Sequence, residues 1–149
     1  MEFTAGKRFT LALVAADRFL AGLTKSGPLP ALVNERTQQI LASAVEVAET
    51  SESRRRGLLG RDSLDPSRAL VIAPCSAIHT FFMRFAIDVM FIDRGGRVLK
   101  IVRDLPAWRM AGSLRAYGAI ELNGGSLQET DVAVGDRLQL RGSVESNPA

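Results

Sequence analysis

The sequence predicts a mainly β protein: a compact antiparallel sandwich or barrel of about eight short strands with one short helix. Two observations carry this prediction. Short apolar runs, rich in β-branched and aromatic residues, alternate with turn-forming residues from position 31 to position 142. Within that range only residues 51–59 have the capping residues of a helix, and the lack of long helices between strands disfavours a parallel βαβ sheet. Residues 31–142 are therefore expected to form a single β domain.

The first thirty residues are expected to be an N-terminal extension that is partly helical. Residues 9–23 are rich in Ala and Leu and contain few β-branched residues, which is typical of a helix. The glycine and two prolines within residues 27–30 end that pattern. A basic pair followed by the apolar residues 9–16 resembles the start of a signal peptide, but Asp17 follows at once. A cytoplasmic location is favoured, and export stays open.

The first elements of the β domain are a hairpin, a strand and the helix. Apolar runs at residues 31–33 and 39–41 flank a polar turn, and residues 44–48 alternate as a half-buried strand does. Thr and Ser side chains cap the start of the helix at residues 51–59, and three arginines lie toward its negative end. Gly60 is expected to stop this helix.

The rest of the domain is expected to consist of strands joined by tight turns. The sequence Asp-Arg-Gly-Gly at residues 93–96 is a strong hairpin signal, because Gly readily adopts positive φ. Residues 143–149 have the composition of a flexible tail. The expected strands cover residues 69–72, 78–82, 89–92, 98–102, 117–122 and 137–140.

The composition excludes several classes of protein. The chain has 149 residues, 46% of them hydrophobic and 23% charged, which fits one globular domain and argues against general disorder. No apolar run approaches the about 18 residues that span a bilayer. The single cysteine excludes an intramolecular disulfide and a multi-cysteine metal site, and neither a metal nor a cofactor is expected. The net charge of +3 is mild and the basic residues are scattered, so nucleic acid is disfavoured as a partner.

Residues 74–93 contain the only cysteine and the only histidine of the chain, Cys75 and His79. On a helix this spacing of four would make their side chains neighbours, but the following residues are expected to form a strand. On a strand the two residues lie roughly 13 Å apart, at about 3.3 Å per residue. A joint catalytic or metal-binding role is therefore disfavoured. Cys75 is more typical of ordinary burial, and His79 of a residue that lines a pocket.

Two acidic residues stand within apolar runs and need an explanation. Asp88 lies between Ile87 and Val89, and Glu121 lies between Ile120 and Leu122. An ionised carboxylate in such a place needs partners. The structural interpretation, which we favour for Asp88, is that backbone N–H groups or an arginine satisfy it. The functional interpretation is an acid or base with a raised pKa in a cleft.

These residues lead to two hypotheses about function. The preferred one is a binding or accessory module with a pocket for a small polar or anionic ligand, whose partner is an unknown small molecule or a protein. The alternative is an enzyme that uses Asp88 or Glu121 as acid or base, or Cys75 as nucleophile. A third reading, nucleic-acid binding through the basic surface at residues 54–61, is weaker. The residues expected to border the pocket are Arg56, His79, Met83, Arg84, Asp88 and Glu121.

Short motifs follow one another in a characteristic order between about residues 39 and 140. They are RGLLGR at residues 56–61, FMR at 82–84 with Asp88, FID at 91–93 with Gly96, IEL at 120–122 with two following glycines, and GD at 135–136. Together they resemble domain-of-unknown-function family 192. The resemblance implies a small prokaryotic domain with a mainly β, sandwich-like fold. It implies no activity, because none is established for the family.

The chain departs from the pattern of that family in three places. Leu59 stands where many members have Met, and Ala86 stands near the position of a usual Pro in a shortened segment. The segment from Cys75 to His79 resembles a subgroup variant, so the family implies no role for those two residues.

Overall fold

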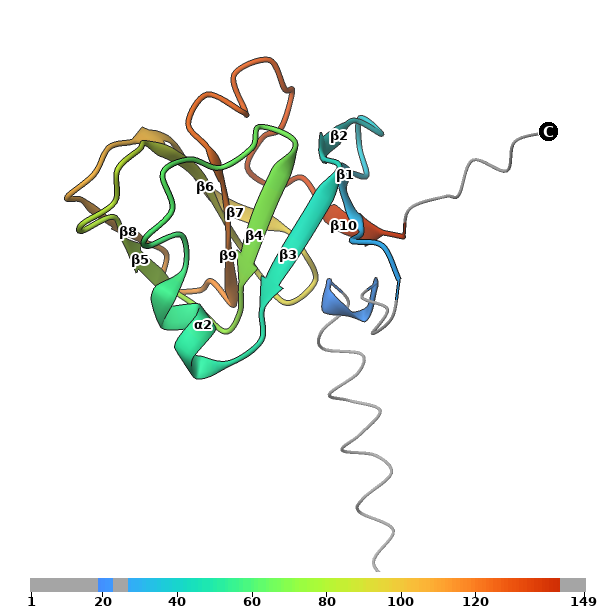
Figure 1. The fold of residues 1–149 in the computed structure, drawn as a ribbon. Coiled ribbons are helices and arrows are strands. Elements are labelled where there is room, and N and C mark those ends of the chain that lie inside the picture. Colours follow the sequence, from blue (N-terminus) through green and yellow to red (C-terminus); the bar gives the residue numbers. More distant parts are fainter. Residues whose placement is uncertain (1–18, 23–26, 143–149) are drawn as a thin grey trace, which may run out of the picture.

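A five-stranded sheet forms the centre of the fold (Figure 1). The computed structural model describes residues 19–22 and 27–142. The strand order is β3-β4-β9-β6-β7, in which β3 and β4 run parallel and the other neighbours run antiparallel. The bounds of these strands are β3 Ala44–Ala48, β4 Arg68–Ile72, β6 Ile87–Ile92, β7 Val98–Leu105 and β9 Gly118–Asn123.

One face of the central sheet is covered by a three-stranded sheet of order β10-β1-β2. Leu32 and Leu138 of the small sheet pack in one hydrophobic core with Met90 and Ile120 of the central sheet. Phe19, just before the short 3-10 helix η1, joins this core. We call this side of the central sheet the closed face. The bounds are η1 Leu20–Gly22, β1 Ala31–Asn34, β2 Ile40–Ala42 and β10 Leu138–Arg141.

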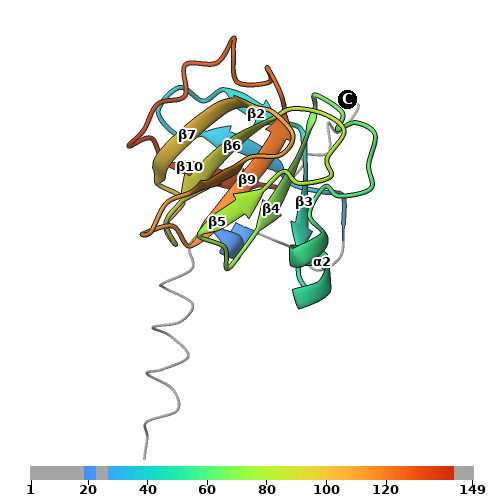
Figure 2. The same ribbon diagram turned by 90° about the vertical axis from the view of Figure 1, so that its left-hand side faces the viewer.

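The opposite side of the central sheet, which we call the open face, carries the helix α2 Ser51–Arg56 and a two-stranded sheet (Figure 2). That sheet pairs β5 Ala77–His79 with β8 Met110–Gly112. A second hydrophobic core joins Phe91 of the central sheet to Ile78 of β5 and to Leu58, which follows the helix.

Strand β6 shows how the two cores share one sheet. Val89 and Phe91 belong to the open-face core, while Met90 and Ile92 belong to the closed-face core. All six residues of β6 are buried. Apart from Asp88 its sequence is apolar throughout, because a strand covered on both faces has no solvent-facing positions to fill with polar residues.

Helix α2 begins as predicted and is shorter than residues 51–59. The Thr50 and Ser53 side chains each accept a hydrogen bond from the other residue's backbone N–H, which forms a capping box. The helix ends at Arg56, and the Gly57 N–H donates to the Ser53 carbonyl at 2.9 Å. Gly57, not the expected Gly60, ends the helix, because its φ of 49° redirects the chain so that Leu58 enters the open-face core.

The parallel pair at one edge of the central sheet differs from the antiparallel pairing that the sequence predicts. Strands β3 and β4 pair in register from Ala44↔Arg68 to Ala48↔Ile72. The connection through α2 has enough residues for the crossover that a parallel pair needs. A parallel pair therefore forms here without a long helix.

The mainly β class is confirmed, with ten strands and one α-helix in the part of the chain that the structure describes. Strand β8 lies outside the strands that the sequence predicts. The strand expected at residues 78–82 ends at His79, and Phe82 has a φ of 63°. The helix expected at residues 9–23 and the tail at residues 143–149 lie wholly or mostly outside the described residues, and the domain limits stay predictions. No helix among residues 19–22 and 27–142 is long and apolar enough to cross a membrane.

Candidate functional site

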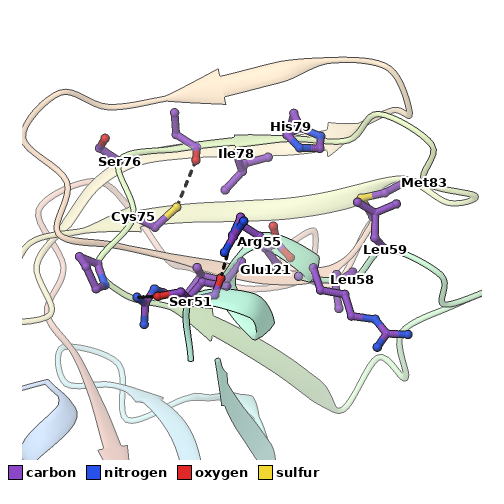
Figure 3. A pocket seen from close by; sticks show the side chains of 16 residues that line it. Ser51, Arg55, Leu58, Leu59, Cys75, Ser76, Ile78, His79, Met83 and Glu121 are labelled. Atoms are coloured by element: carbon purple, nitrogen blue, oxygen red, sulfur yellow. Dashed lines mark hydrogen bonds between the residues drawn. The ribbon is translucent and has the colours of Figure 1, made fainter. Parts of the chain in front are cut away.

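A pocket of about 490 Å³ lies on the open face between α2 and β5 (Figure 3). Helix α2 and the turn after it form one wall, and the segment that leads into β5 forms the other. Glu121 of β9 lies between them. The lining residues are Ser51, Arg54, Arg55, Arg56, Gly57, Leu58, Leu59, Ile72, Pro74, Cys75, Ser76, Ala77, Ile78, His79, Met83 and Glu121.

Glu121 is the buried polar group of this pocket. Its cross-strand partners in the central sheet are Leu70 and Val89, which belong to the open-face core, so its side chain points to the open face. The residue is 3% exposed, and its Oε2 atom is enclosed without a hydrogen-bond partner. A Cβ atom added to Gly57 would lie 3.8 Å from this oxygen. The glycine at the end of α2 therefore keeps the space above Glu121 open.

Burial raises the pKa of the Glu121 carboxyl from 4.5 to about 7, and the positive charge of Arg61 opposes that rise. Arg61 does not form an ion pair with Glu121. It is bound instead to Glu46, with 3.0 Å between Nη1 and Oε2. Glu121 is thus a carboxyl that exchanges its proton near neutral pH, as a general acid or base must.

Three arginines of α2 line the pocket next to this carboxyl. Arg54 donates to the Glu49 carbonyl at 3.0 Å and to the Ser51 hydroxyl, and Arg55 donates to the Ser51 carbonyl. Arg56 is exposed, and its side chain has no hydrogen bond or salt bridge to any described residue. The rim is therefore positively charged, while the floor carries an acid.

Cys75 lies in the pocket wall before β5. Its Sγ donates to the Ala77 carbonyl at 3.1 Å. Burial raises the pKa of this thiol, an interaction with the Ala77 backbone opposes that rise, and the charge of Glu121 adds to it. A protonated thiol is a poor nucleophile. The environment of Cys75 therefore disfavours the nucleophilic role that is one of our hypotheses.

His79 and Met83 border the pocket at the end away from Cys75, as Figure 3 shows. The Nδ1 atom of His79 accepts from the Phe81 backbone N–H at 3.3 Å, and the two rings stack with 5.0 Å between centroids. No hydrogen bond joins Cys75 to His79 among the described interactions. The pair is drawn apart by β5, as expected for a spacing of four on a strand.

Asp88 does not border the pocket, although we expected it there. In register it lies opposite Leu122, a residue of the closed-face core, and so points away from Glu121. Its carboxylate accepts backbone N–H bonds from Asp104 at 2.8 Å, Gly125 at 3.2 Å and Leu127 at 2.8 Å. Asp88 is fully buried and fully partnered, which fits the structural interpretation of this residue.

Arg84 is the second expected pocket residue that lies elsewhere. Its side chain is 66% exposed and forms a salt bridge with Asp62, in the loop after α2. It does not contribute to the pocket lining. Of the seven candidates from the sequence, five line the pocket: Arg56, Cys75, His79, Met83 and Glu121.

Two features, the Arg36–Asp136 ion pair and an aromatic patch, are not among the sequence-based predictions. On the closed-face side, the Arg36 guanidinium and the Asn34 amide donate to Asp136, and the hydrogen bond from Arg36 holds the pKa of that carboxyl well below its usual range. Arg36 and Asp136 are 100 positions apart in the chain, and their ion pair joins the turn after β1 to the turn before β10. No cluster of three or more His, Cys, Asp or Glu residues within the described chain could hold a metal ion.

An aromatic patch lies beside the pocket, next to His79. Phe82 is 70% exposed and Trp108 55%, and their ring centroids are 4.6 Å apart. Both residues have positive φ, 63° and 66°. Thr80 holds the two loops together: its hydroxyl donates to the Pro106 carbonyl at 2.6 Å and accepts from the Arg109 N–H.

Fold and pocket together define a small β domain with a buried acid on the open face of its central sheet. The chain belongs to the DUF192 family, described as "Uncharacterized ACR", whose model matches residues 32–140. The resemblance inferred from the sequence is thereby confirmed, while the subgroup relation of the Cys75 to His79 segment stays a prediction. No curated protein matches the sequence.

Two crystal structures share the fold. One is a protein of unknown function from Novosphingobium aromaticivorans DSM 12444, with a TM-score of 0.66 and 18% identity over 80% of this chain and 96% of that one. The other, from Sinorhizobium meliloti 1021, is described as a candidate transcription regulator, with a TM-score of 0.66 and 19% identity over 78% of this chain and 98% of that one. At these identities the likeness concerns the fold alone.

Proposed function

We propose that this domain binds a small polar ligand in the pocket between α2 and β5. The observation that carries the proposal is the enclosed Oε2 atom of Glu121, which has no partner in the protein. Buried polar atoms are almost always hydrogen-bonded, because an unsatisfied one costs about 1–3 kcal/mol. A ligand that supplies the missing donor removes this cost.

The size and lining of the pocket support the same proposal. Its volume of about 490 Å³ falls in the range typical of small-molecule sites. Apolar side chains such as Ile72, Ile78 and Met83 form about half of the wall, and polar or charged side chains form the other half. Such a lining binds a compact molecule through shape and orients it through a small number of hydrogen bonds.

The positive rim supports an anionic group on the ligand. The Arg56 guanidinium has no partner among the described residues, so it presents a planar set of N–H donors suited to a carboxylate or phosphate. A protein partner that inserts one such side chain would use the same contacts. Nucleic acid is the disfavoured partner, because Arg54 and Arg55 are already bound to oxygens of the helix region.

Thermal unfolding with a panel of small carboxylates, amino acids and phosphates tests this proposal. A ligand at about 100 times its Kd stabilises the folded state by about 2.7 kcal/mol, which is easily measured. We expect a shift with at least one class of compound, and a smaller shift in Glu121→Gln. Glu129→Gln is the matched control, since Glu129 lies outside the pocket lining. If no compound shifts the wild-type protein, the proposal fails.

A second candidate function is acid–base catalysis by Glu121. The pKa of about 7 favours it, since a general acid or base works best near the ambient pH. Asp88 is not a candidate for this role because three backbone donors hold it on the other face. A reaction at this site would show a pH–rate profile with an inflection near 7 that is lost in Glu121→Gln.

We also propose a cytoplasmic location. The apolar run at residues 9–16 is short and is followed directly by Asp17 and Arg18, which is a poor signal peptide. Fusion of residues 1–30 to alkaline phosphatase tests this, because that enzyme is active only after export. Strong phosphatase activity would contradict the proposal.

A further inference from the structure

We propose that the ligand of this pocket is a small zwitterion, with an N–H donor that reaches Glu121 and an anionic group that lies at the arginine rim. The inference rests on the proposed binding function and names the chemical class of the ligand. It follows from the arrangement of charges along the pocket, which differs between floor and rim.

The floor of the pocket presents an acceptor that lacks a donor. Figure 3 shows Glu121 in the middle of the pocket, between Cys75 at one end and Met83 at the other. Its Oε2 atom is enclosed and unpartnered. The neighbouring polar hydrogens do not serve it, because the Cys75 thiol donates to the Ala77 carbonyl and Arg61 is bound to Glu46.

An ammonium or another N–H group of the ligand suits this floor. A hydrogen bond between an ionised donor and a carboxylate is about twice as strong as one between neutral groups. In an enclosed site the two charges also attract each other more strongly than in water. A ligand carboxylate in the same place would meet a like charge unless one of the two groups took up a proton.

The rim of the pocket attracts an anionic group, whereas the floor attracts a cationic one. Three arginines of α2 line it, and the Arg56 guanidinium makes no bond to any described residue. A purely cationic ligand is attracted by Glu121 and repelled by the arginines of the rim. A purely anionic ligand is attracted by the rim and repelled by Glu121 at the floor. A molecule that carries both groups gains at both ends, so charge complementarity selects it over either relative.

Proton linkage gives a signature of this arrangement. Glu121 holds its proton partly near neutral pH, so an ammonium that binds the ionised form releases protons, and a ligand that accepts from the protonated form takes them up. The other charged or titratable groups facing Glu121 are the arginines of α2, Arg61, the Cys75 thiol and His79. Proton exchange that disappears when Glu121 alone is replaced therefore comes from Glu121 and not from these other groups.

The experiment is calorimetric titration with ω-amino carboxylates of graded length, each compared with the monoamine and the dicarboxylate of the same length. Titrations near neutral pH in two buffers of different ionisation enthalpy measure the protons exchanged. We expect one amino carboxylate to bind about tenfold or more tightly than both matched relatives, with net proton release. In Glu121→Gln the advantage over the dicarboxylate and the proton release should vanish, and in Arg56→Gln the advantage over the monoamine should fall.

Three results are distinguishable from this expectation. Tightest binding of the dicarboxylate, with proton uptake, would overturn the zwitterion while leaving a ligand pocket in place. If no compound of the amino carboxylate series binds, while phosphates or other compounds still stabilise the wild-type protein, the zwitterion is likewise overturned and the ligand pocket remains. Absence of any stabilising compound would overturn the proposed function itself. Glu129→Gln, which should behave as wild type, controls for the substitution, and the proton count on the wild type does not depend on any variant folding.

Discussion

Asp88 and Glu121 are buried carboxylates on the neighbouring strands β6 and β9, and they lie in opposite surroundings. Asp88, on the closed face, accepts three backbone hydrogen bonds. Glu121, on the open face, has an enclosed oxygen with no partner and a pKa of about 7. The two residues are one step apart in the register, since Asp88 pairs with Leu122 and Val89 pairs with Glu121.

The difference teaches that burial alone does not identify a functional acid. Both carboxylates are withdrawn from water, but only one has its hydrogen bonds completed by the protein. The closed face uses its acid to hold the turn at residues 124–127 and the end of β7 against the sheet. On the open face, one oxygen of the acid has no hydrogen-bond partner in the protein.

The largest expected effect is the loss of the Asp88 carboxylate. Asp88→Ala leaves three backbone N–H groups without an acceptor, at about 1–3 kcal/mol each, so we expect the free energy of unfolding to fall by about 3–5 kcal/mol. Urea denaturation measures it. Asp88→Asn, which keeps one carbonyl oxygen, should cost less. A loss below about 1 kcal/mol in the alanine variant would contradict the structural role of Asp88.

Two glycines test how tightly each face is packed. A Cβ atom at Gly96 would lie 2.4 Å from the Leu138 carbonyl oxygen and 2.9 Å from Phe19, whereas a Cβ at Gly57 meets nothing closer than 3.5 Å. Both residues have positive φ. We expect Gly57→Ala to cost about 1–3 kcal/mol from backbone strain, since φ 49° with ψ −127° is a conformation almost restricted to glycine. Gly96→Ala should cost about 1–3 kcal/mol more, because overpacking is added to the strain. Gly142→Ala is the control, with open space around it. Equal losses at Gly96 and Gly57 would remove the distinction between the faces.

Replacing Glu121 should stabilise the protein, and only at higher pH. Below pH 4.5 the carboxyl is protonated in both states; between 4.5 and about 7 the unfolded chain loses its proton first, so the free energy of unfolding falls as pH rises. At pH values above the folded-state pKa, this loss of unfolding free energy amounts to roughly 3 kcal/mol. A glutamine cannot ionise, so the variant avoids the loss. Denaturation of Glu121→Gln and wild type across this pH range measures it. The same stability difference at both ends of the range would show that Glu121 does not titrate there.

The smallest effect concerns the reactivity of Cys75. Because burial raises the pKa of its thiol, we expect iodoacetamide to label it more slowly than a free thiol at neutral pH. The Glu121 charge contributes to the raised pKa, so Glu121→Gln should speed labelling by a few-fold. Labelling is followed by mass spectrometry in the folded protein. Labelling of the wild type faster than a free thiol would restore Cys75 as a nucleophile.

Much of the fold could be predicted because it is encoded locally. The alternation at residues 44–48 predicts β3 with its observed bounds, and the apolar run at residues 89–92 predicts most of β6. The direction of β3 beside β4 could not be predicted, because side-chain periodicity is the same in parallel and antiparallel strands. The early end of α2 depends on Gly57, whose turn is useful only because Leu58 finds a core to enter.

The candidate site, like the fold, could be predicted from the sequence only in part. The sequence identifies Glu121 and Asp88 as unusual, since each interrupts an apolar strand. Which of them faces a pocket depends on the register of β6 against β9, and the sequence carries no direct record of that pairing. Arg84 was misplaced for a similar reason, because its partner Asp62 comes from a loop that is distant in the chain.

Helix α2 contains no buried residue, and this has a consequence for its amide hydrogens. A six-residue helix that is held by one capping box and by the turn at Gly57 loses few stabilising contacts when it opens locally. Its amides should exchange with solvent much faster than those of β6, which is buried along its whole length. The wall above Glu121 would then open and close many times for each unfolding of the sheet, so that a molecule enters or leaves the pocket while the rest of the domain stays folded.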